Sequence, residues 1–129
     1  MPSRLKPMDG DRRREERQAR DRRGRQAEWL AALALRLRGY RILARRERTP
    51  LGEIDLIAVR GQRLAFVEVK RRATLEAAEA SISAAQRTRI RRAASLWLAQ
   101  NPRYQAHAQG YDLIFLIGRR WPRHLENAL

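Results

Sequence analysis

Residues 53–70, EIDLIAVRGQRLAFVEVK, decide the fold because they contain two β-rich runs separated by a short turn. Residues 53–59 and 63–70 are rich in the branched and aromatic side chains that favour strands. Arg-Gly-Gln at residues 60–62 forms the connection between the two runs. Two such runs joined by a tight, glycine-containing turn predict an antiparallel hairpin.

Helical and strand patterns on both sides of the hairpin indicate an α/β domain. Apolar residues recur at three- and four-residue steps from Gly24, and Gly39 stands where a helix C-terminal glycine belongs. The patterns further predict a short strand at 40–44, an amphipathic helix within 75–100 and a buried strand at 111–117. The order helix, three strands, helix, strand predicts a mixed β-sheet flanked by helices.

The chain of 129 residues has the size of a single domain. Residues 1–23 are a mixed-charge run with nine basic and five acidic side chains, and we expect a flexible basic segment there. Residues 24–129 are expected to form the α/β domain. No apolar run approaches the roughly 20 residues of a membrane span, and the charged N-terminus does not resemble a signal peptide. We therefore expect a cytoplasmic protein.

The net charge of +15 attracts polyanions, and phosphate backbones are the commonest of these in the cytoplasm. Residues 1–23 carry only +4 of this charge, so the excess is not confined to the N-terminal segment. A basic surface that serves solubility alone is the alternative interpretation. Proteins that associate with ribosomes or RNA share this composition, so charge alone does not separate a binding protein from an enzyme.

Most enzyme signatures are absent from the sequence. There is neither a glycine-rich loop followed by Lys-Ser or Lys-Thr, which argues against P-loop nucleotide binding, nor a Gly-x-Ser-x-Gly motif. The two histidines, His107 and His124, lie outside zinc-ligand spacing, and we interpret each as a surface or packing residue. The chain has no cysteine, which excludes disulfides, thiolate zinc sites and ordinary iron–sulfur clusters.

Acidic residues inside the two apolar strands are the remaining candidates for chemistry. Asp55 lies within EIDLIA, and Glu68 lies between Val67 and Val69, where a carboxylate is costly to bury without a partner. Strand alternation places Glu68 and Lys70 on one face of the strand. If the hairpin pairs as predicted, Asp55 returns close to Glu68 on the neighbouring strand.

Two adjacent carboxylates repel each other unless a cation lies between them. Oxygen ligands of this kind suit Mg²⁺ or Mn²⁺, which also bind phosphate and lower the pKa of a water molecule. The alternative is an exposed ion pair between Glu68 and Lys70, which contributes only ~0–1 kcal/mol. The chain has 27 arginines but only two lysines, Lys6 and Lys70, which favours a chemical reason for the lysine at position 70.

GEIDLIA at residues 52–58 and FVEVKR at residues 66–71 resemble motifs of the bacterial YraN-like family. The resemblance runs from about Gly24 to the C-terminus and includes Tyr111-Asp112 and the terminal HLENAL. That family is similar to restriction-endonuclease-like nucleases and to archaeal Holliday-junction resolvases. The resemblance implies a restriction-endonuclease-like core with the order α-β-β-β-α-β.

The resemblance also implies roles for individual residues. In such nucleases an Asp, followed by Glu-x-Lys on the next strand, forms the active site, and Asp55, Glu68 and Lys70 take these positions. The metal ligands would be Asp55 and Glu68. Glu28 on the first helix matches an acidic residue that often completes such a metal site, and a surface charge is an equal alternative for it.

Two accessory positions follow from the same resemblance. Glu53 belongs to the motif either as an outer ligand or as a structural hydrogen-bond acceptor, and Gln86 is expected to contact the site or the phosphate backbone. A solvated helix face is an equal alternative for the arginines of the long helix. The side chains expected to hold the phosphate backbone are Arg71, Arg72, Arg87, Arg89, Arg91 and Arg92.

Together these features predict a Mg²⁺- or Mn²⁺-dependent endonuclease that acts on DNA, with branched or repair intermediates as candidate substrates. The alternative is a non-catalytic nucleic-acid-binding protein that retains the nuclease fold. A third and weaker alternative, based on composition, is a small ribosome- or RNA-associated protein. The likeness to junction resolvases implies a homodimer, but no segment of the sequence identifies a dimer surface.

Overall fold

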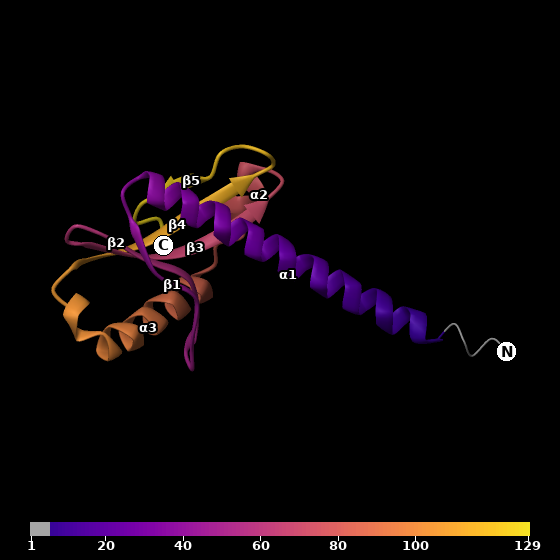
Figure 1. Cartoon of the computed structure of the whole chain (residues 1–129), viewed down its shortest axis with the longest axis horizontal. Helices are drawn as coiled ribbons and strands as arrows, with labels where there is room; N and C mark the ends of the chain where they lie inside the picture. Colours follow the sequence, from indigo (N-terminus) through magenta and orange to yellow (C-terminus); the bar gives the residue numbers. More distant parts are fainter. Residues whose placement is uncertain (1–5) are drawn as a thin grey trace.

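In the computed structural model, which describes residues 6–129, the chain forms one β-sheet with helices on both of its faces (Figure 1). The helices are α1 (Lys6–Leu37), α2 (Leu75–Ala80), α3 (Ala84–Gln100) and the 3₁₀ helix η2 (Pro102–Tyr104). The strands are β1 (Arg41–Thr49), β2 (Gly52–Arg60), β3 (Arg63–Arg72), β4 (Ala108–Ile117) and β5 (Arg123–Leu125). No helix in residues 6–129 combines the length and apolar character that a membrane span requires.

The five strands lie in the order β1-β2-β3-β4-β5, so that neighbours in the sequence are also neighbours in the sheet. β3 and β4 are parallel, because α2 and α3 carry the chain back along the sheet between them, and the other pairs are antiparallel. β2 and β3 form the predicted hairpin, in which Arg60 pairs with Arg63. The predicted α/β fold with a mixed sheet flanked by helices is therefore confirmed.

Each face of the sheet packs against one long helix (Figure 1). On one face, Ala31 of α1 packs in a cluster with Val67 of β3. On the opposite face, Ile90 and Trp97 of α3 pack in a second cluster with Phe66, whose ring meets the Trp97 ring edge-on at 5.9 Å. Because both faces are covered, the central strands carry nearly continuous apolar runs.

Helix α1 is longer than the sequence pattern indicates. The sequence predicts a flexible segment through residue 23, whereas the chain is helical from Lys6, and residues 1–5 lie outside the described part. Residues 10–18 are exposed, and this half of α1 projects away from the sheet (Figure 1). Helix α1 ends at Leu37, and Gly39 follows with a φ of +92°, as expected for a helix C-terminal glycine. The division into a segment 1–23 and a domain 24–129 stays a prediction.

The chain between β3 and β4 forms two helices where the sequence predicts one. α2 ends at Ala80, and α3 begins after Ser83, whose Oγ accepts a hydrogen bond from the Gln86 amide nitrogen at 3.1 Å. Strand β5 was not predicted, because three residues are too short to show a period. Both differences leave the predicted topology of the sheet core unchanged.

Asp112 ties the C-terminal segment to the sheet. Its carboxylate is fully buried, accepts two hydrogen bonds from Arg63 at 2.7 Å, and lies 2.8 Å from His124 Nε2 and 2.9 Å from the Asn127 amide nitrogen. Burial by itself raises the pKa of Asp112, but the hydrogen bonds from Arg63 and His124 lower it well below its usual range. The Arg63 guanidinium fills the space that a side chain would need at Gly110.

Candidate active site

Asp55 lies near the start of β2, between the fully buried Ile54 and Leu56. The hairpin register pairs Leu56 with Val67, which brings the start of β2 beside the last residues of β3. Asp55 Oδ2 accepts a hydrogen bond from the Val69 amide nitrogen at 2.8 Å. The carboxylate is therefore held in place by the neighbouring strand.

Glu68 and Lys70 lie on the face of β3 that packs against α3. Their side chains form an ion pair, with 3.4 Å between Lys70 Nζ and Glu68 Oε1. Lys70 is only 8% exposed, so this pair is not the surface ion pair that was the alternative interpretation. In the amide orientation that satisfies both of its neighbours, Gln86 accepts from Lys70 Nζ at 2.6 Å and donates to the Ser81 carbonyl at 2.8 Å. Lys70 thus has two partners that fix its ammonium group.

Three acidic side chains from α1 and β2 converge beside Asp55. Glu28, Glu53 and Asp55 each offer a carboxylate oxygen, and these three atoms lie within 4.8 Å of one another. Glu28 accepts a hydrogen bond from Arg46 Nε at 2.7 Å, and Glu53 lies 3.6 Å from Arg48 Nε. The structure therefore places Glu53 inside the acidic group, whereas the sequence suggested an outer or structural position for it.

A hollow of about 200 Å³ joins this acidic group to the end of β3. Asp55 and Glu68 both line it, Gln86 and Arg89 reach it from α3, and the Lys70 ammonium group lies beside its wall. The residues that line the hollow are Gly52, Glu53, Asp55, Glu68, Gln86, Arg89 and Ile90. The sheet and α3 line this hollow, and Glu28 of α1 adjoins it through its approach to Glu53 and Asp55. We call the hollow together with Glu28 the acidic hollow.

Burial raises the pKa values of the two central acids, Asp55 and Glu68. Desolvation contributes most to the raised pKa of Asp55, which reaches about 7, and repulsion from Glu68 comes next. Burial also raises the pKa of Glu68, against the attraction of Lys70, which lowers it. A cation in the acidic hollow would favour the charged forms of both acids.

The donor atoms of the acidic hollow suit a hard divalent cation. Glu28, Glu53, Asp55 and Glu68 offer only carboxylate oxygens, which Mg²⁺ and Mn²⁺ prefer over nitrogen and sulfur ligands. The amide oxygen of Gln86 faces Lys70 and is thus a poor candidate ligand. A cation at this place would offset the repulsion from Glu68, which adds to the effect of burial on the pKa of Asp55.

The six arginines expected to hold a phosphate backbone do not line one surface. Arg89 lines the acidic hollow, whereas Arg71 lines a separate hollow on the other side of the sheet, together with Leu30. Arg91 donates to the Leu129 carbonyl at 2.8 Å and covers the Tyr111 ring at 4.5 Å, which ties it to the C-terminus. The three others, all at least partly exposed, are Arg72, Arg87 and Arg92.

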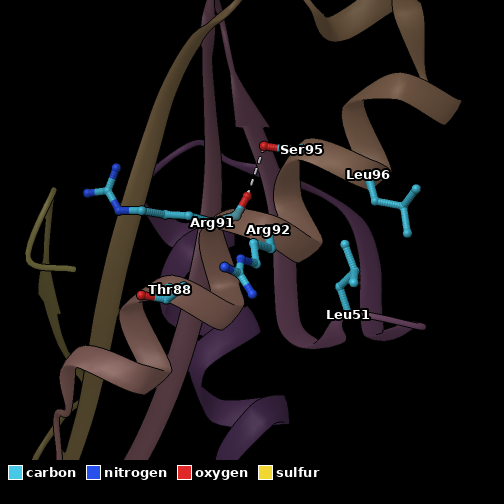
Figure 2. Close-up of a pocket in the computed structure, with 6 residues that line it drawn as sticks. All are labelled: Leu51, Thr88, Arg91, Arg92, Ser95 and Leu96. Carbon is cyan, nitrogen blue, oxygen red and sulfur yellow. Dashed lines mark hydrogen bonds between the residues drawn. The ribbon is translucent and has the colours of Figure 1, made fainter.

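A wider hollow of about 520 Å³ lies between α3 and the turn that joins β1 to β2 (Figure 2). Leu51 and Leu96 lie side by side at its edge, while the Arg91 side chain extends away from them (Figure 2). None of the described residues that line it is acidic or a histidine. The acidic hollow, which gathers carboxylates, is therefore the better candidate for chemistry.

The histidines lie outside the acidic hollow. The His124 side chain is 3% exposed and contacts Asp112, so its interpretation as a packing residue is confirmed. His107 packs its ring at 5.3 Å from that of Tyr104, which agrees with a packing role as well. The sequence does not predict Arg46 as the partner of Glu28, because no pattern in its strand distinguishes it from the adjacent arginine.

Comparison with known proteins identifies a family for most of the chain. The model of the uncharacterised protein family UPF0102 matches residues 27–116, a range that contains every acidic residue of the hollow. The UPF0102 protein of Chelativorans sp. (strain BNC1) is 55% identical over 111 residues, which are 86% of this chain and 90% of that protein. The UPF0102 protein of Methylorubrum extorquens (strain PA1) is 54% identical over 112 residues, which are 87% and 88% of the two chains.

Proposed function

Because the chain belongs to the uncharacterised protein family UPF0102, we infer its function from the site, and we propose a Mg²⁺- or Mn²⁺-dependent endonuclease that hydrolyses phosphodiester bonds in DNA. The proposal includes a restriction-endonuclease-like relationship, in which an Asp and a Glu-x-Lys motif form the active site. Asp55, Glu68 and Lys70 are the catalytic residues under this proposal. Glu28 and Glu53 complete the acidic ligand set.

One observation carries the proposal. A buried lysine lies 3.4 Å from one carboxylate of an acidic hollow in which a second carboxylate has a pKa raised to about 7. A bound cation would offset the repulsion between carboxylates that lie this close together. The charge of +15 on the chain adds a reason for a polyanionic substrate.

The chemistry assigned to each group follows from its position. A divalent cation bound by the four acids would lower the pKa of a water molecule and offset the negative charge that develops on the phosphate. Lys70, which Glu68 and Gln86 hold in place, donates a hydrogen bond to the attacking water or to a phosphate oxygen. Arg89, at the rim of the acidic hollow, holds the phosphate that approaches it.

Cleavage assays test the proposal directly. Wild type, Asp55→Asn and Glu68→Gln are incubated with linear, nicked and four-way-junction DNA in Mg²⁺, in Mn²⁺ and in EDTA. We expect metal-dependent cleavage of at least one substrate by wild type, and a loss of about 10²-fold or more in both variants. Glu79→Gln, which removes an exposed carboxylate from α2, is the matched control and is expected to retain the wild-type rate.

The outcomes separate the proposal from its rival. Equal cleavage by wild type and Asp55→Asn would contradict the assigned site. Tight binding of DNA by wild type without cleavage of any substrate would favour a non-catalytic nucleic-acid-binding protein. Cleavage of RNA but not of DNA would support the assigned site and identify RNA, in place of DNA, as the substrate.

A further inference from the structure

The loop between β4 and β5, residues 118–122, lies at the same end of the sheet as the acidic hollow. β3 and β4 are parallel and in register, so that Lys70 pairs with Phe115 and Arg72 pairs with Ile117. The Gly118 amide nitrogen donates to the Arg72 carbonyl at 3.3 Å, after which the chain leaves the sheet. The loop therefore begins on the adjacent strand, only a few residues beyond the level of Lys70.

Two hollows adjoin each other around this loop. One has a volume of about 310 Å³, with walls that include Leu30, Arg71 and Trp121, and the other has a volume of about 280 Å³. Both are lined by Gly118, Arg119 and Arg120, which lie between them. Among the described residues that line either hollow, none is acidic. We call this surface the Trp121 surface.

The side chains of the Trp121 surface combine an exposed aromatic ring with cations. Trp121 is 59% exposed, which is unusual for a large apolar residue, and Pro122 beside it is buried. Arg119 and Arg120 are exposed on the same loop, and Arg71 reaches the surface from β3, directly after Lys70. An aromatic face within a group of arginines is the arrangement that binds an unstacked base together with its phosphates.

We propose that the Trp121 surface binds an unpaired nucleotide of the substrate strand, with the base stacked on the Trp121 indole and the flanking phosphates held by Arg71, Arg119 and Arg120. This inference rests on the proposed function and specifies the substrate class: nucleic acid with a single-stranded segment next to the cleaved bond. In a paired duplex, bases are stacked on one another and do not present a face to the indole. The Trp121 surface thus selects flaps, gaps or opened junctions over blunt duplex.

The wider hollow beside α3 is a poorer candidate for this role. None of the described residues that line it is aromatic, and Arg91 at its edge donates a hydrogen bond to the Leu129 carbonyl. Its apolar side chains, Leu51 and Leu96, offer no flat face for a base. The charge and the exposed indole together favour the Trp121 surface.

Binding measurements in EDTA test the inference without interference from cleavage. Fluorescence anisotropy measures the affinity for a labelled single strand, a duplex with a single-stranded flap and a blunt duplex of equal length. We expect Trp121→Ala to weaken binding of the single strand and the flap about tenfold and to leave the blunt duplex almost unchanged. Trp121→Phe, which retains an aromatic face, is expected to recover most of the loss.

Two control variants separate stacking from general effects. Trp29→Ala removes an indole that is 53% exposed on α1 and does not line either hollow, so it is expected to bind all three substrates as wild type does. Arg41→Ala removes an exposed cation at the start of β1 and measures the general loss from one positive charge. Thermal unfolding of each variant checks that it remains folded. If Trp121→Ala unfolds at a lower temperature than wild type, the affinities of Trp121→Phe for the three substrates test the inference instead.

The possible results separate the inference about Trp121 from the proposed nuclease activity. Wild-type affinity of Trp121→Ala for every substrate, or an equal loss on flap and blunt duplex, would overturn the inference. Weaker self-association of Trp121→Ala in sedimentation, with DNA binding intact, would overturn it in favour of a contact between copies. A Trp121-dependent preference for flaps without any cleavage in Mg²⁺ would retain this inference and reject the nuclease. Metal-dependent cleavage that does not depend on Trp121 would retain the proposed nuclease and reject this inference.

Discussion

Asp55 has a pKa of about 7, raised first by burial and then by Glu68, so it titrates near neutral pH. A raised pKa means that the folded protein holds this proton more tightly than the unfolded chain does. The resulting stabilisation is complete below the ordinary value of 3.8 and is lost as the pH rises through about 7. We therefore expect Asp55→Asn to raise the free energy of unfolding of the metal-free protein by about 1–3 kcal/mol at pH 8, and by much less at pH 4.

Urea denaturation in EDTA at the two pH values measures this difference. The control is Glu79→Gln, which is exposed and is expected to change the free energy of unfolding by less than about 0.5 kcal/mol. A gain of equal size at pH 4 and at pH 8 would show that charge repulsion is not its cause. Addition of Mn²⁺ at pH 8 is expected to stabilise wild type more than Asp55→Asn.

Lys70 is buried and is held by polar contacts with Glu68 and Gln86, so its shape matters as well as its charge. A guanidinium group is planar and larger than an ammonium group and does not fit the same pair of partners. We expect Lys70→Arg to lower the cleavage rate about 10²-fold or more, despite the retained charge. Single-turnover cleavage measures the rate, and Lys6→Arg, the same change at the only other lysine of the chain, is expected to have no effect.

Asp112 is predicted to matter for stability rather than for chemistry. Arg63 and His124 lower its pKa, so the stabilisation it provides is present above pH 3.8 and is lost as the pH falls below that value. Asp112→Asn leaves the partly buried Arg63 without its fully buried counter-charge, and we expect a loss of about 3 kcal/mol at pH 7. A loss below about 1 kcal/mol in urea denaturation would contradict this role. So would a loss of stability at acid pH that is as large in Asp112→Asn as in wild type.

Part of the candidate site could be predicted from single residues, and part of it could not. Strand alternation was enough to place Glu68 and Lys70 on one face, because the period of a strand is fixed by its backbone. The approach of Glu53 to Glu28 depends on how α1 docks on the sheet, which local patterns do not specify. Trp121 lies outside any periodic segment, and only its exposure in the folded chain distinguishes it.

At the scale of elements, the hairpin of β2 and β3 was predictable because the strand-forming residues and the glycine-containing turn between them both indicate a hairpin. Helix α1 was underestimated because its first half has no apolar stripe, the feature by which helices are recognised in a sequence. Arginine and glutamate are nevertheless good helix formers, and opposite charges at three- and four-residue spacing support a solvated helix. The break between α2 and α3 was missed because both helices share one apolar pattern.

The exposed half of α1 leads to a prediction about stability. Residues 10–18 are exposed and bury little apolar surface, so they contribute little to the core. We expect removal of residues 1–23 to shift the midpoint of thermal unfolding by less than about 3 °C and to leave the far-ultraviolet spectrum of the remaining domain intact. A loss of cooperative unfolding would show that this half of α1 is required for folding.

At the scale of the whole molecule, acidic groups gather in one hollow of a strongly basic chain. The net charge of +15 was evident from the sequence, but the concentration of carboxylates at one end of the sheet arises only when α1, β2 and β3 pack together. A basic exterior draws a polyanion towards the protein, while the acidic hollow repels phosphate unless a cation is bound. Cation binding is therefore the step on which the proposed function depends.

The measurement that tests this most directly is anomalous diffraction from crystals soaked in Mn²⁺. We predict a peak in the acidic hollow, about 2.1 Å from oxygens of Asp55 and Glu68, that disappears in Asp55→Asn. Absence of the peak from wild-type crystals, when the same Mn²⁺ concentration supports cleavage in solution, would contradict the assignment of these acids as the metal ligands.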